Sequence, residues 1–398
     1  MKNIQGNHVL IVADSWEYIQ FYLIDRLDLK VVLFQSPDRQ KRDKKEICEE
    51  IHYLDLDDAD LAIGLADRLH KKYNFKAVCS FTDEGVELAS IIAKRLKLRH
   101  NPLTPSKLVN NKSLFREHLN NKRISEVDYI LSENIEQLVD FISGHNKYPV
   151  ILKPNKGAGS ENVYRADNFE ELIRYFNIIR ETSSETAVLV EEFLDGSEIS
   201  VETISFNGEH HIINITDKLV FNNVEYGHIM PSNISNKEEV IALTKKVLEA
   251  IDHKTGPCHI EIKLTSKGPK VVEAHTRPGG DFIVLLLSDV FNVDVISLTI
   301  NYLISGVKPS LNPHEGKGAA VRYFNSPPGI IKTINGLEGV LKNPHVFAHE
   351  INVKVGDTVT EVTNSFKRSG CIVIKGDSGI DAMNKAEELI KGIRIITS

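Results

Sequence analysis

Two strand-like stretches joined by a short turn place the strongest constraint on the fold. They are CHIEIKL and KVVEAHTR, with Ser266-Lys267-Gly268 between them. Charged and apolar residues alternate in both, as in an antiparallel hairpin with one buried face. The alternation places His259 and Glu261 on one face of the first strand. The turn then predicts that Glu261 and Glu273 lie close together on the paired strands.

Two carboxylates on one face of a sheet repel each other unless a cation lies between them. Carboxylate oxygens suit Mg²⁺, so the hairpin predicts a metal site at Glu261 and Glu273. His275 and Arg277 continue the same face as Glu273. A guanidinium beside concentrated negative charge suits a phosphoryl or acyl-phosphate oxygen. The alternative is a structural cluster of ion pairs, although charges are costly to bury without a functional role.

A glycine-rich segment, VILKPNKGAGS, precedes the hairpin in the chain. A strand would deliver Lys153, and Lys156, Gly157, Ala158, Gly159 and Ser160 would follow in a loop. Glycines let backbone N–H groups approach an anion closely, so this loop is a candidate phosphate cover. It is not a Walker loop, because no Gly-Lys-Ser/Thr opens a helix. The alternative is a plain hairpin turn with solvated lysines.

Acidic residues also follow the apolar strand in AVLVEEFLDGSEIS. Glu191 and Glu192 end the strand, and Glu198 follows a glycine turn. A strand end that borders a cleft can offer backbone groups and a carboxylate to an adenine, and a second carboxylate can hold ribose hydroxyls. The alternative is a strand that runs into an ordinary polar loop.

The first hundred residues alternate strand and helix patterns. HVLIVAD, VVLFQ and KAVCSF are typical of buried strands and predict an open parallel sheet. KAVCSF runs into Thr82-Asp83-Glu84-Gly85, at a strand's carboxyl end, where such sheets bind ligands. Asp14 would border the same cleft, and Trp16 would pack the first helix or line a pocket mouth.

Composition excludes several classes of protein. The formal net charge is -7, whereas a nucleic-acid binder would usually show a basic face. The scattered cysteines form no C-x-x-C pair, which favours free thiols in a reducing compartment over a zinc or disulfide framework. No apolar run approaches the length of a membrane span, and the N-terminus does not read as a signal peptide. We therefore expect a cytoplasmic protein without nucleic-acid or membrane partners.

These pieces together resemble the ATP-grasp superfamily over residues 105–306. The motifs that carry the resemblance are, in order, Lys112, Lys153, the glycine-rich loop, Glu191-Glu192-Phe193, Glu198, Glu261 and Glu273-x-His275-x-Arg277. The resemblance implies an α/β ATP-grasp fold with an N-terminal open parallel-sheet domain. The expected divisions are that domain (1–104), a small lid subdomain with its lead-in helix (105–190), a central catalytic domain (191–306) and a C-terminal α+β, strand-rich region (307–398).

The resemblance also implies roles for individual residues. The residues expected to bind ATP are Lys112, Lys153, Gly157, Ala158, Gly159, Ser160, Glu191, Glu192, Phe193 and Glu198. A pair of Mg²⁺ ions, or Mn²⁺, is expected on Glu261, Glu273 and His275, and catalytic roles on Lys153, Glu273 and Arg277. His275 stands where the superfamily generally has Asn, and an imidazole nitrogen is a poorer Mg²⁺ ligand than an amide oxygen.

Within the superfamily, three segments are similar to the bacterial L-amino-acid ligases that make dipeptides: ITDKLVFNNVEYGHIMPSN, EAHTRPGGDFI and GAAVRYFNSPPG. This implies a ligase that joins two L-amino acids through an aminoacyl phosphate and releases ADP and phosphate. The expected substrate-binding residues are Glu84, His228, Arg277, Gly279, Gly280, Asp281 and Arg322.

An amino-acid substrate carries a carboxylate and an ammonium, and different side chains suit each of these groups. Arg277 and Arg322 suit the substrate carboxylate, and Glu84 suits its ammonium. Asp281 would favour a polar or cationic substrate such as arginine, or it would instead cap the helix that follows.

Small amino acids are the expected partners, and a homodimer is compatible with the sequence. The nearest rival function is a ligase that loads an amino acid onto a carrier protein or another amine acceptor. A nucleotide-binding regulator would be expected to lose one metal carboxylate, yet Glu261 and Glu273 are both present. A biotin-dependent carboxylase is disfavoured because the chain has no lysine motif for biotin and lacks the larger partner domains.

Overall fold

A computed structural model describes residues 7–13, 27–42, 48–145, 148–183, 186–312 and 317–398. Asp14 and Trp16 lie outside these residues. Among the described residues, we find no helix with the length and apolar character that a membrane span would need.

The N-terminal region is an open parallel sheet with strand order β3-β2-β1-β4, as the alternating pattern predicts. Every residue of β1 is buried, as expected for a parallel strand that is covered on both faces. The elements are β1 (His8–Val12), β2 (Lys30–Gln35), η1 (Pro37–Arg42), β3 (Cys48–Tyr53), α2 (Ala59–Tyr73), β4 (Ala77–Cys79) and α3 (Val86–Arg95).

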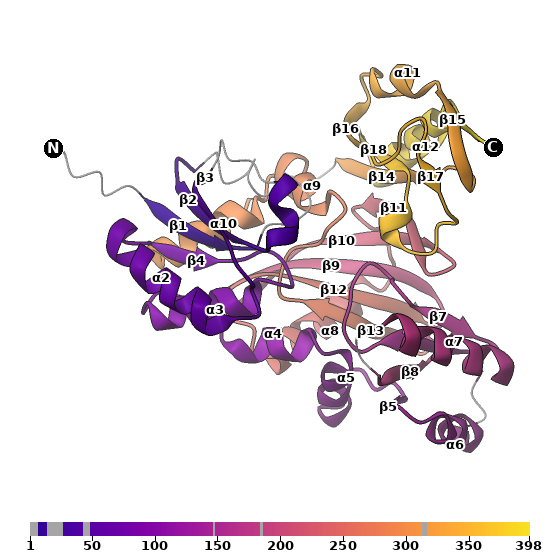
Figure 1. Cartoon of the computed structure of the whole chain (residues 1–398), viewed down its shortest axis with the longest axis horizontal. Helices are drawn as coiled ribbons and strands as arrows, with labels where there is room; N and C mark the ends of the chain where they lie inside the picture. The colour runs from indigo at the N-terminus through magenta and orange to yellow at the C-terminus, as the bar shows by residue number, and fades with distance from the viewer. Residues whose placement is uncertain (1–6, 14–26, 43–47, 146–147, 184–185, 313–316) are drawn as a thin grey trace.

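The centre of the molecule is an eight-stranded antiparallel sheet, ordered β13-β12-β9-β10-β11-β14-β18-β16 (Figure 1). Its first five strands in that order are β13 (Gly268–His275), β12 (Gly256–Thr265), β9 (Ser197–Phe206), β10 (Glu209–Phe221) and β11 (Val224–Met230). The predicted hairpin is confirmed, because Glu261 pairs with Glu273 and His259 with His275.

Strand β11 is an element that the sequence pattern did not assign. Asn222 and Asn223, between β10 and β11, both have positive φ, at 49° and 62°. Successive left-handed residues form the tight turn whose twist matches a hairpin, and Asn tolerates that conformation well. The turn therefore sends β11 back along β10 and brings Glu225 and His228 into the sheet.

The region expected to be the lid subdomain has a small antiparallel sheet, ordered β5-β8-β6-β7. It contains β5 (Tyr129–Ser132), α6 (Ile135–His145), β6 (Val150–Pro154), β7 (Tyr164–Ala166), α7 (Phe169–Thr182) and β8 (Val188–Glu192). The expected division at residue 190 falls inside β8. Two helices, α4 (Leu103–Val109) and α5 (Lys112–Asn121), lead into the lid.

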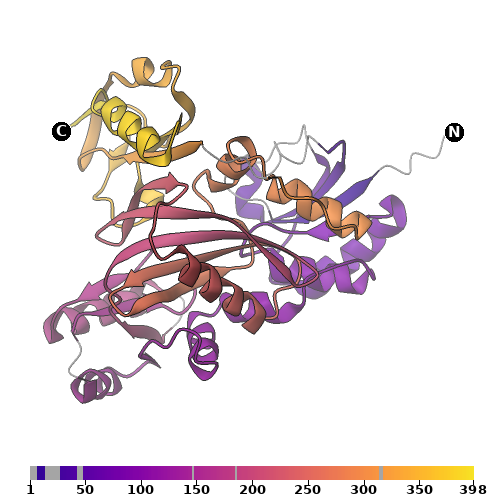
Figure 2. The ribbon, with the colours of Figure 1, turned by 180° about the vertical axis from the view of Figure 1, so that it is seen from behind.

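The C-terminal region adds strands to the central sheet and forms a separate small sheet, β17-β15-β19. It lies at one end of the molecule, away from the lid helices α6 and α7 (Figures 1 and 2). Its elements are β14 (Gly318–Phe324), β15 (Gly329–Asn335), α11 (Leu337–Leu341), β16 (Val346–Ile351), β17 (Thr358–Val359), η2 (Ser365–Lys367), β18 (Gly370–Gly376), α12 (Gly379–Ile390) and β19 (Arg394–Thr397).

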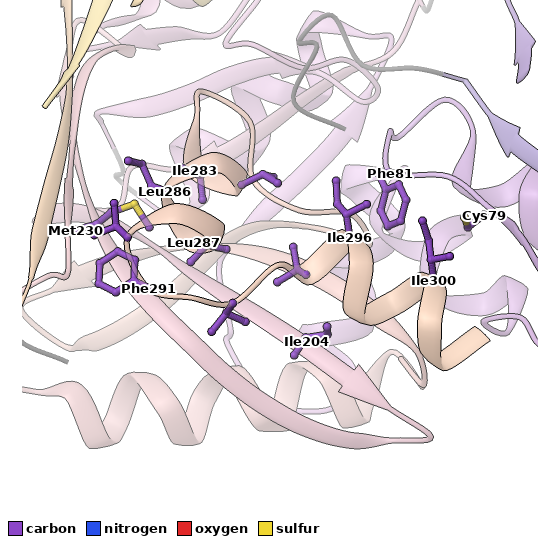
Figure 3. Packing of buried hydrophobic residues seen from close by; sticks show 14 of the residues in the cluster. Cys79, Phe81, Ile204, Met230, Ile283, Leu286, Leu287, Phe291, Ile296 and Ile300 are labelled. Carbon is purple, nitrogen blue, oxygen red and sulfur yellow. The ribbon is translucent and has the colours of Figure 1, made fainter. Parts of the chain in front are cut away.

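One apolar core joins the parallel sheet to the central sheet. Helices α9 (Ile283–Asp289) and α10 (Val295–Ser305) contribute to it, and α8 (Lys237–Ala250) belongs to a second core. Figure 3 shows Ile296 and Ile300 of α10 packed beside Phe81, which directly follows β4. Burying each such side chain contributes about 1.5–3 kcal/mol. The loop after β4 also lies close to the end of β13, because Asp83 contacts His275.

Candidate active site

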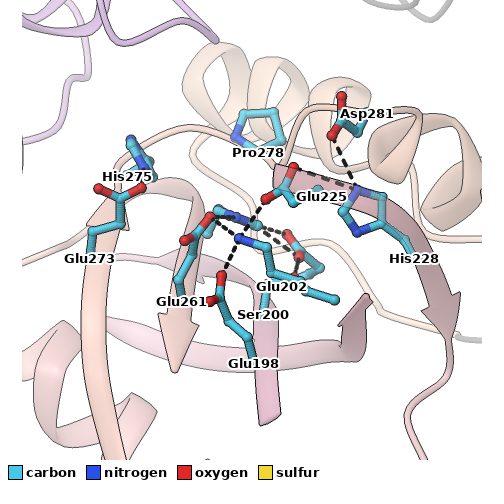
Figure 4. Close-up of polar contacts among 12 residues, drawn as sticks. Glu198, Ser200, Glu202, Glu225, His228, Glu261, Glu273, His275, Pro278 and Asp281 are labelled. Carbon is cyan, nitrogen blue, oxygen red and sulfur yellow. Dashed lines mark hydrogen bonds and ion pairs between the residues drawn. The ribbon is translucent and has the colours of Figure 1, made fainter. Parts of the chain in front are cut away.

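Charged side chains from neighbouring strands gather on one face of the central sheet (Figure 4). Glu198 lies on β9 opposite Lys218 of β10, and Glu261 of β12 lies opposite Glu273 of β13. Alternate residues of a strand share a face, so these pairings bring four charged groups together. Glu225 joins them from β11.

Lys218 is the centre of this cluster. Its Nζ lies 2.8 Å from Glu198, 2.7 Å from Glu225 and 2.6 Å from Glu261, and its side chain is only 3% exposed. Burial disfavours the ammonium, but the three carboxylates hold the pKa of Lys218 well above its usual range. The three carboxylates also lie close enough together to share a metal ion. Neither Lys218 nor Glu225 was among the site residues expected from the sequence.

The two hairpin carboxylates each have cationic partners. Glu273 lies 3.0 Å from Nζ of Lys112 and 3.3 Å from Nε2 of His275. Glu261 lies 3.3 Å from Nε2 of His259, in addition to its contact with Lys218. Burial would raise the pKa of Glu273, but Lys112 and His275 hold it well below its usual range. Both carboxylates are therefore ionised, the state that a Mg²⁺ ligand requires.

His275 is held between two carboxylates. Its Nδ1 lies 3.0 Å from Oδ1 of Asp83, while Nε2 faces Glu273. Burial lowers the pKa of His275, but Asp83 outweighs this and raises it above its usual range. In this arrangement the ring acts as a cation, and it would have to lose a proton before either nitrogen could bind a metal. Metal binding by His275 stays a prediction.

Arg277 is oriented by the loop after β4. Its Nε and Nη2 both donate to Oδ2 of Asp83, at 2.9 and 2.8 Å. Burial would raise the pKa of Asp83, but Arg277 and His275 together lower it. Asp83 is thus an orienting residue that sequence reasoning named only as part of a polar loop. Its neighbour Glu84 accepts from Nη2 of Arg39 at 2.6 Å and is about half exposed.

The first turn of α5 connects the hairpin to the glycine-rich loop. Asn111 caps the helix, and the backbone N–H groups of Lys112 and Ser113 donate to Asn155, which follows β6. Lys112 Nζ donates to the carbonyl of Gly157 at 2.9 Å while it contacts Glu273. One lysine therefore touches both the loop and a hairpin carboxylate, which the linear spacing could not reveal.

Lys153 and Glu191 belong to a buried ion-pair network. Lys153 Nζ lies 2.6 Å from Oε2 of Glu191, and Arg116 Nε lies 2.7 Å from Oε1 of the same carboxylate. Burial would raise the pKa of Glu191, but the two cations lower it to about 2. Glu191 thus orients Lys153, and its expected place in the adenine pocket stays a prediction.

Other residues expected at the nucleotide have contacts of their own. Glu192 accepts from the backbone N–H of Asp128 at 3.0 Å. Phe193 lies under the guanidinium of Arg165, with its ring centroid 4.5 Å from Cζ. Gly157, Gly159 and Ser160 have positive φ, so the loop depends on glycine at two of these positions.

The predicted substrate residues do not all come together. His228 Nε2 lies 3.1 Å from Oδ2 of Asp281. A Cβ on Gly279 would come within 2.9 Å of His259 Nδ1 and 3.0 Å of Glu202, so this close approach requires glycine, whereas Gly280 has open space. Arg322 lies apart, because its Nε binds Glu387 of α12 at 2.9 Å.

Asp281 has a different partner from either of those expected. Arg368 donates to both of its carboxylate oxygens, at 3.0 and 2.7 Å. The capping alternative is wrong, because Phe282 occupies the N-cap position of α9 and no side chain caps the helix. Arg368 lies in the C-terminal region, and sequence reasoning gave no signal for it.

Comparisons with known proteins agree with this architecture. Family models match successive parts of the chain: an ATP-grasp N-terminal domain at 25–100, an ATP-grasp domain at 146–284 and an L-amino acid ligase C-terminal domain 2 at 322–398.

Two curated relatives match most of the chain at low identity. Dapdiamide A synthase of Enterobacter agglomerans is 24% identical, covering 77% of this chain and 76% of its own. An L-arginine-specific L-amino acid ligase of Bacillus subtilis is 23% identical, covering 78% of each chain. The crystal structure of an L-amino acid ligase from Bacillus licheniformis superposes with a TM-score of 0.84 at 20% identity, covering 99% of both chains.

Proposed function

We propose that the chain, a member of the ATP-grasp superfamily, joins two L-amino acids at the expense of ATP. The match of residues 322–398 to an L-amino acid ligase C-terminal domain supports this proposal. The product would be a dipeptide, released with ADP and phosphate. The observation that carries the proposal is the pairing of Glu261 with Glu273, together with the contact from Lys112 to both Glu273 and the glycine-rich loop.

The donor set fits a magnesium nucleotide. Glu261 and Glu273 offer ionised oxygens on one face of the sheet, and Glu198 and Glu225 lie around the same Lys218. Mg²⁺ bound to Glu261 and Glu273 would neutralise charge on the phosphoryl oxygens and polarise them. Lys112 and Lys153 would bind the phosphates of ATP, and the loop at 157–160 would cover them and exclude water.

Catalysis would then rest on positioning and electrostatics. The carboxylate of the first amino acid forms a bond to the γ-phosphorus while the bond to ADP breaks. Arg277 would neutralise the resulting acyl phosphate, with Asp83 holding the guanidinium in place. The amine of the second amino acid, having lost its ammonium proton, attacks the acyl carbon, and phosphate leaves. No nucleophilic side chain is required.

A screen of amino-acid pairs tests the proposal. The purified protein is incubated with ATP, Mg²⁺ and pairs of the standard amino acids, and phosphate release is measured beside mass detection of dipeptides. We expect release that needs both amino acids and is lost in Glu273→Gln. Phosphate release with one amino acid, but amide formation only with a carrier protein, would instead support the carrier-loading function. Absence of amino-acid-dependent release would refute both.

A further inference from the structure

A C-terminal segment, residues 364–369, lies between the glycine-rich loop and the Asp281 end of the site. We call it the η2 segment, because it contains η2. The backbone N–H of Ser365 donates to the carbonyl of Gly159 at 3.1 Å. A Cβ on Gly159 would come within 2.7 Å of the ring of Phe366, so the two segments are in close contact. The η2 segment thus contacts the glycine-rich loop at one end.

Its other end carries Arg368, which is fixed from several sides. Nε donates to the carbonyl of Ser365 at 2.9 Å, inside the same segment. The guanidinium lies 3.6 Å from the ring centroid of Tyr323, a stacked cation–π arrangement. The Arg368 side chain is 8% exposed. A guanidinium held by a ring and a backbone carbonyl is pre-organised to pair with one carboxylate.

That carboxylate is Asp281. Both of its oxygens accept from Arg368, and His228 approaches Oδ2 as well. Burial would raise the pKa of Asp281, but Arg368 and His228 hold it well below its usual range. The pair is therefore a carboxylate and a guanidinium that neutralise each other.

This pair adjoins the cluster around Lys218. Glu225 lies 3.7 Å from Nη1 of Arg368 through one oxygen and 2.7 Å from Lys218 Nζ through the other. Figure 4 shows Asp281 and His228 on one side of Glu225, with Glu261 and Glu273 on the other. A substrate bound over the hairpin carboxylates would therefore have the Asp281–Arg368 pair beside it.

From this geometry we infer that Arg368 determines which side-chain charge the amino-acid site accepts, by neutralising Asp281, so that the native enzyme prefers uncharged over cationic side chains. The inference rests on the proposed ligase function. A cationic side chain near Asp281 would have to share the carboxylate with a guanidinium already in contact with it. Like-charge repulsion at such a site selects strongly against the wrong substrate.

Removing either member of the pair should expose the charge of the other. In Arg368→Gln, Asp281 loses its guanidinium, and the relative kcat/KM for arginine or lysine over leucine should rise about tenfold or more. In Asp281→Asn, Arg368 is left without this partner, and glutamate should gain over leucine instead. The double variant should return both ratios towards the wild-type values, since neither charge remains.

The test measures kcat/KM for leucine, lysine and glutamate with one fixed second amino acid and saturating ATP. Arg368→Lys retains the charge and should retain the wild-type preference. Lys367→Gln is the matched control, because it removes one positive charge from the exposed neighbouring position. Opposite shifts in Arg368→Gln and Asp281→Asn support the inference.

Two outcomes would overturn the inference, and they differ from a failure of the proposed function. An equal fall for all three substrates in both single variants would mean that the pair is only structural. A lysine preference in the wild type would mean that Arg368 does not mask Asp281. Wild-type protein that turns over no amino-acid pair would instead refute the ligase function itself, and this inference with it.

Discussion

The buried network around Glu191 gives a prediction about how the small β5-β8-β6-β7 sheet is held against the rest of the protein. Arg116 is 1% exposed and joins α5 to two other elements: Nε donates to Glu191 of β8, and Nη1 and Nη2 donate to the carbonyls of Val271 and Val272 in β13. Replacing it by Met keeps most of the volume. The change leaves the carbonyls of Val271 and Val272, and one carboxylate oxygen of Glu191, without the hydrogen bonds that Arg116 donates.

The structure sets the size of the effect. Burial alone would raise the pKa of Glu191, yet Arg116 and Lys153 lower it to about 2. A pKa about two units below that of an ordinary glutamate corresponds to a net stabilisation of ~3 kcal/mol by the two cations. Breaking a buried ion pair from one side costs about 3–5 kcal/mol. We therefore expect Arg116→Met to lower the free energy of unfolding by ~3 kcal/mol or more.

Urea unfolding followed by circular dichroism measures this loss. Arg95→Met is the matched control, because Arg95 pairs with Asp67 at 3.0 Å while 62% exposed. An exposed ion pair contributes about 0–1 kcal/mol. A second arm compares Glu191→Gln with the double variant, which should be less destabilised than the sum of the single changes. If Arg116→Met cost no more than Arg95→Met, the reasoning about the buried network would be refuted.

Three further predictions concern chemistry, the lid and pH. Glu273→Gln should lower turnover on the order of a hundredfold or more, since it removes a carboxylate that pairs with Lys112, and the circular dichroism spectrum should not change. A wild-type rate would support the structural ion-pair alternative. ATP with Mg²⁺ should slow proteolytic cleavage at residues 156–160, because the loop would close over the phosphates, and equal cleavage with and without nucleotide would argue against a lid. Burial lowers the pKa of His253 to about 4, and its Nδ1 accepts from Asn101 while Nε2 donates to Gly256. As pH falls, His253 therefore binds a proton in the unfolded chain before it does so in the folded protein. The free energy of unfolding should drop by ~3 kcal/mol between about pH 6.5 and pH 4, and His253→Gln should make this dependence on pH less steep. An equally steep dependence in the variant would contradict the assignment.

Local patterns in the sequence were enough to predict the hairpin and the N-terminal parallel sheet. The alternation in β12 and β13 depends only on neighbouring residues, so the pairing of Glu261 with Glu273 could be worked out in advance. The apolar run of β1 likewise indicated a strand covered on both faces.

Contacts set by long-range packing could not be predicted in this way. Lys218 contacts Glu225 across the hairpin turn at Asn222-Asn223, and Asp83 contacts Arg277 although the two residues are far apart in the chain. Arg368 and Asp281 are far apart in the chain, and nothing in either segment indicates their pairing.

The face of a strand is equally hard to assign without its neighbours. Arg322 was a reasonable carboxylate-binding candidate from its chemistry alone. In β14 it points to Glu387 of α12, whereas the adjacent Tyr323 lies against Arg368 near the site. A shift of one residue in a strand reverses the face, so chemistry alone could not choose between the two.

Transfer of ¹⁸O tests the central claim most directly. The first amino acid is supplied with an ¹⁸O-labelled carboxylate, together with ATP, Mg²⁺ and the second amino acid, and the products are analysed by mass spectrometry. An aminoacyl phosphate leaves one carboxylate oxygen on the released phosphate, so the account predicts labelled phosphate and unlabelled ADP. Label in AMP, or dipeptide formed with unlabelled phosphate, would contradict it.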